Sequence, residues 1–240
     1  MRVAFVGNPN SGKTSLFNKL TGNNQKIGNW PGVTIEKKVG KILKTDIDVV
    51  DLPGVYSLFP FTSEEKVSRD YLVFEKPDLV VNVIDSTALE RSLYLTTQLF
   101  DLGVKVILAL NMADLLEKKG INLDETKLAS ELNLPAIKIS ARTGLGIESL
   151  ISEIKKQKTQ GFQKSPEIYS KIVQNELKLT KNNLNLESDF LAIEKLITEK
   201  QDETNQSLMH TRQVFEKVYQ IDSLQVVVGQ KYEFISKVIY

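Results

Sequence analysis

The sequence contains no cysteine and only one histidine among its 240 residues. Without a thiol there is no disulfide, no cysteine nucleophile and no thiolate metal ligand, and a lone histidine cannot assemble a zinc site by itself. His210 is therefore expected to have a structural or surface role. The lack of cysteine also fits a protein of a reducing compartment.

Net charge and long apolar runs are also scarce. The formal net charge is +1, so no excess of basic residues indicates binding to nucleic acid or to an anionic membrane. The first apolar run breaks at Gly7, too early for a secretory signal, and no run approaches the roughly 18 residues of a membrane helix. We expect a soluble fragment. Because no helix-stop signal precedes Tyr240, we expect the natural chain to continue beyond it.

Short apolar runs rich in Val and Ile alternate with amphipathic helical stretches. This alternation predicts an α/β fold in which helices cover a mainly parallel sheet. A polar break at 44–46 predicts one antiparallel hairpin within 39–50. Thr62 with Glu65 predicts a capping box that starts a helix, and Gly103 predicts a helix end. The expected strands are 2–6, 47–50, 79–84, 104–110 and 136–139.

A polar stretch at 155–166 precedes a change of pattern. Residues 167–240 contain one glycine and no proline, and their apolar residues recur at helical spacing, which predicts three or four packed helices. We therefore expect a nucleotide-binding α/β domain over 1–158, a linker over 159–166 and a small all-helical domain over 167–240.

Residues 7–14, GNPNSGKT, match the phosphate-binding P-loop pattern GxxxxGK[ST]. Its glycines let backbone N–H groups turn toward the phosphates, and the following helix offers its N-terminus to negative charge. Lys13 is expected to reach the β- and γ-phosphates, and the Thr14 hydroxyl to bind Mg²⁺. An apolar strand before the motif and a helical pattern after it supply the required context.

Residues 51–54, DLPG, follow a buried strand, as the second phosphate motif of a nucleotide-hydrolysing switch does. Asp51 is expected to hold Mg²⁺ through water, and Gly54 to offer its N–H to the γ-phosphate. Such switches often carry a polar residue after this glycine to position the attacking water. Here Val55 stands in that place, so another group must take over the role.

Two further motifs indicate that the base is guanine. In NMAD, at 111–114, the carboxylate of Asp114 can accept two hydrogen bonds from guanine, whereas adenine would leave it unpaired. Asn111 is expected to tie the base edge to the P-loop. In SAR, at 140–142, backbone N–H groups can meet the guanine O6.

The order of these motifs resembles that of the Ras-like GTPases related to translation factors. One departure is Met112, because the family usually has a lysine there, whose stem covers the base; methionine can cover the same apolar face. The stretches GNPNSGKTSLFN, GNWPGVT, DLPGVYSL and ERSLYLTTQL resemble the N-terminal region of the ferrous iron transport protein B family.

This resemblance implies a GTPase domain on the cytoplasmic face of the cell membrane. A helical domain that favours bound GDP and a transmembrane iron-transport region would follow it, and self-association is left open. Thr34 would be the first-switch threonine that closes over Mg²⁺. In potassium-stimulated members of the family, an asparagine at the Asn10 position and first-switch carbonyls at the positions of Gly28 and Trp30 bind K⁺ beside the phosphates. This ion would support hydrolysis where Val55 cannot.

The expected site residues fall into three groups. Catalytic roles are expected for Asn10, Lys13, Thr34 and Gly54. Magnesium would be held by Thr14, Thr34 and Asp51, and potassium by Asn10, Gly28 and Trp30. Nucleotide contacts are expected from Gly7, Asn8, Pro9, Asn10, Ser11, Gly12, Lys13, Thr14, Ser15, Gly32, Val33, Thr34, Asp51, Leu52, Pro53, Gly54, Asn111, Met112, Asp114, Ser140, Ala141 and Arg142.

Three other functions fit parts of the sequence. An RNA- or ribosome-associated GTPase can share the P-loop asparagine, but the C-terminal segment is near charge balance and lacks a GXXG clamp or stacking motif. A nucleotide-binding signalling module with negligible turnover fits Val55. An ATPase is opposed by Asp114. No nucleic-acid partner is expected.

Overall fold

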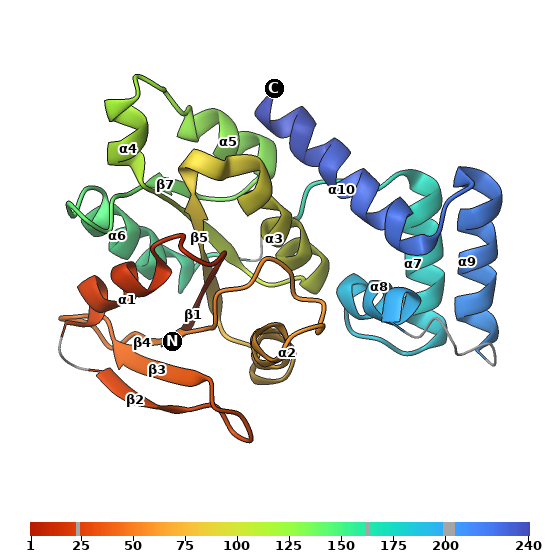
Figure 1. Cartoon of the computed structure of the whole chain (residues 1–240), viewed down its shortest axis with the longest axis horizontal. Coiled ribbons are helices and arrows are strands. Elements are labelled where there is room, and N and C mark those ends of the chain that lie inside the picture. Colours follow the sequence, from red (N-terminus) through yellow and green to blue (C-terminus); the bar gives the residue numbers. More distant parts are fainter. Residues whose placement is uncertain (23–24, 162–163, 199–204) are drawn as a thin grey trace. The chain divides into compact units, whose positions relative to one another are not determined.

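The computed structural model describes residues 1–240 except 23–24, 162–163 and 199–204 (Figure 1). The chain divides into two compact units. The first comprises Met1–Thr96 and Val104–Lys164, and the second comprises Thr97–Gly103 and Ser165–Tyr240. The predicted linker lies between the last helix of the first unit and the first complete helix of the second.

A seven-stranded, mainly parallel sheet forms the centre of the first unit, in the order β2-β3-β4-β1-β5-β6-β7. Among the strands of the described residues, only the pairs β2–β3 and β3–β4 are antiparallel. The predicted α/β class and the predicted hairpin are therefore confirmed, with strand ends that differ by one or two residues. The strands are β1 (Arg2–Gly7), β2 (Gln25–Asn29), β3 (Glu36–Lys41), β4 (Asp48–Asp51), β5 (Leu79–Asp85), β6 (Val106–Asn111) and β7 (Ala136–Lys138).

Strand β2 is the one strand that the sequence pattern did not predict. Its residues, QKIGN, are mostly exposed, and Ile27 is 65% exposed. It forms because its backbone pairs with β3, with Gly28 opposite Lys37. Residues 26–38, the predicted first switch, therefore lie on two strands and the loop at 30–35 that joins them.

Helices connect the strands of the first unit (Figure 1). Thr62 and Glu65 form the predicted capping box at the start of α2, and Gly103 ends α3 with φ +71°. On one face of the sheet, α1 and α6 bury a core that contains Phe5 and Phe17, whose rings lie 6.3 Å apart. The helices are α1 (Lys13–Thr21), α2 (Ser63–Asp70), α3 (Leu89–Leu102), α4 (Ala113–Lys118), α5 (Glu125–Leu132) and α6 (Ile147–Gln157), with a π-helical turn at Tyr71–Glu75 and a 3₁₀ turn at Ser86–Ala88.

The described secondary structure of the second unit is all helical, as predicted, with non-helical segments such as 165–170 before and between the helices. It contains α7 (Lys171–Asn183), α8 (Asp189–Thr198), α9 (Gln206–Tyr219) and α10 (Ser223–Ile239), together with the last residues of α3. Aliphatic and aromatic side chains such as Phe190 and Phe215 fill its core. No helix in the described part of the chain is long and apolar enough to cross a membrane.

A buried ion pair lies within the second unit. The Lys231 ammonium contacts the Asp101 carboxylate at 2.5 Å, and the Tyr169 hydroxyl donates to the same carboxylate at 2.9 Å. The two charged side chains are only 0% and 4% exposed. Burial raises the pKa of Asp101 and lowers the pKa of Lys231, and each charge partly offsets the effect of burial on the other.

Candidate nucleotide-binding site

The P-loop joins the end of β1 to the start of α1. Gly12, which precedes the helix, has φ +81°, and a Cβ added to it would lie 2.2 Å from Nδ2 of Asn111, so only glycine fits. No described side chain caps the first turn of α1, which leaves its N–H groups to a ligand. Asn10 lies exposed at the tip of the loop in the left-handed conformation, with φ +65°.

Three side chains meet at the start of α1, where the sequence predicts that phosphates and Mg²⁺ bind. The buried Lys13 ammonium pairs with Oδ1 of the buried Asp51 carboxylate. The Thr14 hydroxyl donates to Oδ2 of the same carboxylate at 2.9 Å. A hydroxyl and a carboxylate so close together are the hard oxygen ligands that Mg²⁺ prefers, so these residues fit a magnesium site.

The predicted second switch, residues 51–65, begins in contact with the P-loop. A Cβ added to Gly54 would lie 3.2 Å from Cα of Pro9, so the two segments are in close contact. The N–H of Val55 donates to the Gly7 carbonyl at 3.1 Å, and its side chain is buried at 3% exposure. Val55 therefore contributes to packing and presents no polar group to an attacking water.

Tyr56 and Arg91 lie next to this turn. Tyr56 is 44% exposed, and the Arg91 guanidinium lies 5.3 Å from the centre of its ring. The Asn8 side-chain amide donates to the Arg91 carbonyl at 3.4 Å. The start of α3 thus contacts both the P-loop and the second switch, which the sequence pattern did not indicate.

In the first switch, Trp30 is a packing residue. Its side chain is 7% exposed, its ring packs edge-on against Tyr71 at 5.5 Å, and the Lys37 ammonium lies 4.4 Å from the ring centre. Its carbonyl accepts a hydrogen bond from the Val33 N–H at 3.2 Å. Thr34 is exposed in the same loop, and the described residues give its side chain no hydrogen bond. The predicted magnesium ligand Thr34 is thus not joined to Thr14 and Asp51 here.

Asn111 connects the predicted base-binding loops to the P-loop. Its Nδ2 donates to the Ser11 carbonyl at 2.8 Å, and its Oδ1 accepts from the Ala141 N–H at 2.9 Å. The side chain is almost fully buried, so both bonds are shielded from water. The tie between Asn111 and the P-loop, expected from the sequence, is present in the structure.

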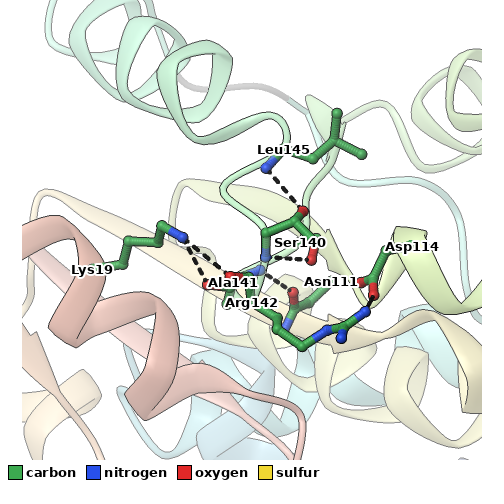
Figure 2. A network of polar contacts seen from close by, with 8 residues as sticks. Lys19, Asn111, Asp114, Ser140, Ala141, Arg142 and Leu145 are labelled. Carbon is green, nitrogen blue, oxygen red and sulfur yellow. Dashed lines mark hydrogen bonds and ion pairs between the residues drawn. The ribbon is translucent and has the colours of Figure 1, made fainter.

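Figure 2 shows the polar network around the loop at 140–145. The Lys19 ammonium donates to the carbonyls of Ala141 and Arg142, at 3.3 Å each. The Thr143 N–H donates to the Ser140 hydroxyl at 3.1 Å. The backbone of this loop is therefore held from both sides. The role of Lys19 was not evident from the sequence, because its partner lies 122 residues away.

Asp114 lies at the start of α4, after Met112 in the left-handed conformation with φ +65°. Its side chain is 12% exposed. The Arg142 guanidinium donates to its Oδ2 at 2.5 Å. Hydrogen bonds from Arg142 and then from the Ser140 hydroxyl hold the pKa of Asp114 below its ordinary value. The carboxylate that was predicted to recognise guanine is therefore stabilised in its ionised form and is largely enclosed.

Comparison with known proteins is consistent with this geometry. The family model for ferrous iron transport protein B matches residues 1–154. The Fe(2+) transporter FeoB of Escherichia coli K12 is 46% identical over 156 residues, which cover 62% of this chain and 20% of that protein. The chain thus spans about a fifth of the length of the curated relatives it matches.

Solved structures extend the similarity to the whole chain. NFeoB of S. thermophilus bound to GDP.AlF4- and K+ is 36% identical, covers 100% of this chain and 99% of its own, and superimposes with a TM-score of 0.87. The cytosolic domain of L. pneumophila FeoB is 33% identical, with a TM-score of 0.84 and coverage of 100% and 98%. The similarity includes the helical unit as well as the sheet unit. This chain belongs to the ferrous iron transport protein B family.

Proposed function

We propose that this chain is the GTP-binding and GTP-hydrolysing region of a ferrous iron transporter. The observation that carries the proposal is the link through Asn111, which joins the P-loop to the loop at 140–142 by two buried hydrogen bonds. Asp114 lies three residues after Asn111 and would bind the base. Lys13 lies two residues after Ser11 and would bind the phosphates. The relatives from S. thermophilus that were solved with GDP or GMPPNP support the same conclusion.

Magnesium would be held by Thr14 directly and by Asp51 through water, with Thr34 joining when the first switch closes. When bound, Mg²⁺ neutralises charge on the β- and γ-phosphate oxygens. Lys13 already has a buried anionic partner in Asp51. A bound phosphate would be a second anionic partner for this ammonium. Lys13 can therefore move from the Asp51 carboxylate to the phosphate without becoming an unpaired buried charge.

Hydrolysis needs a group that positions water and one that offsets developing charge. Because Val55 is buried, we assign the first role to backbone groups near Thr34 and Gly54. For the second we propose K⁺, bound by the Asn10 side chain and by the carbonyls of Gly28 and Trp30. When bound, K⁺ supplies positive charge beside the phosphates. The Trp30 carbonyl accepts one hydrogen bond, from Val33, and its second lone pair is left for the ion.

The nucleotide state would act on transport through the two switches. The γ-phosphate would order residues 26–38 and 51–65, and hydrolysis would release them. We assign the GTPase domain to 1–158, the linker to 159–166 and a helical domain that favours bound GDP to 167–240. A transmembrane iron-transport region of the same protein would be the partner at the cytoplasmic face of the membrane, and self-association is left open.

Base recognition by Asp114 provides the direct test. With Mg²⁺ present, the wild-type chain is expected to hydrolyse GTP and not ATP. Asp114→Asn should lose activity on GTP and gain activity on XTP, because xanthine has a carbonyl where guanine has its amine and an asparagine amide can donate to it. Asp46→Asn, an exposed substitution with the same loss of charge, should keep the wild-type preference. Equal turnover of GTP and ATP, or an unchanged preference in Asp114→Asn, would contradict the proposal.

A binding module with negligible turnover is the second candidate, and the buried Val55 is the observation that favours it. Such a module would bind GTP as tightly as GDP and retain it intact over hours in both potassium and sodium salts. Turnover in either salt would exclude it.

A further inference from the structure

Arg142 contacts the base-recognition carboxylate from outside the site. Its side chain is 65% exposed, whereas that of Asp114 is 12% exposed. Nη2 of the arginine lies 2.5 Å from Oδ2 of the aspartate, and Figure 2 shows the guanidinium reaching across to it. An exposed cation thus contacts a largely enclosed anion.

Guanine would need the same oxygen. Recognition of the base uses two parallel hydrogen bonds, from N1–H and from the exocyclic amine, and these require both oxygens of the Asp114 carboxylate. Oδ2 already accepts from Arg142, and the Ser140 hydroxyl also hydrogen-bonds the carboxylate. Each carboxylate oxygen has two lone pairs, so the arginine competes with the base where both approach Oδ2 from the same side.

The backbone of the loop does not depend on the Arg142 side chain. Lys19 holds the carbonyls of residues 141 and 142, and Asn111 holds the Ala141 N–H. The guanidinium can leave Asp114 while the loop stays in place. Removal of this side chain would accordingly change one contact and leave the rest of the site intact.

We propose that Arg142 is an intramolecular competitor of the guanine base, which holds the Asp114 carboxylate closed until a nucleotide displaces it. The inference rests on the proposed GTP-binding function and adds a control of affinity at the same site. Because the competition acts at the base, it weakens the binding of GTP and GDP by the same factor. It does so by slowing association, because only the fraction of molecules with an open Asp114 carboxylate can accept the base.

The size of the effect follows from the exposure of the arginine. An ion pair whose cation is exposed to water holds the closed arrangement about one to five times as populated as the open one. The apparent dissociation constant rises by the reciprocal of the open fraction, so Arg142 should weaken nucleotide binding by about two- to sixfold. Salt screens the pair, and the factor should shrink as ionic strength rises.

The test compares Arg142→Gln with the wild-type chain in binding of fluorescent GDP and of a non-hydrolysable GTP analogue, at low and high salt. Arg142→Gln should bind both nucleotides about two to six times more tightly at low salt, with little difference at high salt. Arg142→Lys, which keeps the charge, should stay closer to the wild type. Lys118→Gln, an exposed charge loss on α4, should not tighten binding.

Weaker binding by Arg142→Gln would overturn the inference, because it would mean that the arginine helps to hold the base. Equal binding at every salt concentration would overturn it as well. In both cases the wild-type chain still binds GDP, so the proposed function stands. If the wild-type chain binds no guanine nucleotide, the proposed function fails and the inference fails with it.

Discussion

Replacement of Lys231 by methionine should destabilise the helical unit strongly. The substitution keeps an apolar chain of similar length but leaves the buried Asp101 carboxylate with the Tyr169 hydroxyl and without its cation. Removal of one partner from a buried pair costs about 3–5 kcal/mol of unfolding free energy. Hydrogen exchange of the α10 amides, measured by mass spectrometry, reports the local stability of this unit.

The loss in Lys231→Met should also depend on pH. Burial already raises the pKa of Asp101 above its ordinary value of 3.8, and loss of the Lys231 attraction raises it further. Asp189, the next charged group that acts on it, is an anion and raises it too. A raised pKa in the folded state means that stability is fully present below 3.8 and falls as pH rises toward the folded value. The variant should therefore be closest to the wild type in acid and furthest from it at neutral pH.

Two further variants sharpen this prediction. Lys237→Met removes an exposed lysine of the same helix, paired with Glu233, and should change stability by less than about 0.5 kcal/mol. Asp101→Leu combined with Lys231→Met should recover most of the loss, because neither charge of this pair remains. Two results would show that this account of the pair is wrong. One is that the α10 amides of Lys231→Met exchange as slowly at neutral pH as those of the wild type. The other is that the stability difference between the variant and the wild type grows as the pH falls.

Other predictions concern the nucleotide site. Asn111→Asp would oppose a carboxylate oxygen to the Ser11 carbonyl, and calorimetry should show GDP binding weakened by about tenfold or more; unchanged affinity would contradict the link. Gly54→Ala puts a Cβ 3.2 Å from Cα of Pro9, so single-turnover assays should show slower hydrolysis with GDP binding retained. Asp51→Asn should raise the Mg²⁺ concentration needed for half-maximal GTP binding by about tenfold, and an unshifted titration would remove Asp51 from the magnesium site.

The centre of the fold follows from local sequence features. Buried parallel strands read as continuous apolar runs, and β1, β5 and β6 are of this kind. The capping box at Thr62 and the glycine at 103 act within a few residues, so their effect can be predicted without knowing the rest of the chain. The P-loop is predictable for the same reason, because the spacing of its glycines and lysine determines the conformation of the loop.

The features that sequence reasoning missed depend on contacts between distant residues. Strand β2 has no apolar pattern, because it is an edge strand that is exposed along most of its length and is held mainly by its pairing with β3. Lys231 looks like an ordinary helix lysine, and only its partner 130 residues away shows that it is buried. The pair of Asp114 and Arg142 joins the start of α4 to the loop at 140–142, and this contact could not be predicted from either segment alone.

The most direct measurement is GTP hydrolysis by this chain at fixed Mg²⁺, in potassium and in sodium salt of equal ionic strength, with ATP as the control. The account predicts turnover of GTP and not ATP, faster in potassium, with the potassium effect lost in Asn10→Ala. Absence of GTP turnover in both salts would contradict the proposed hydrolysis. Equal turnover in the two salts would contradict the potassium site at Asn10.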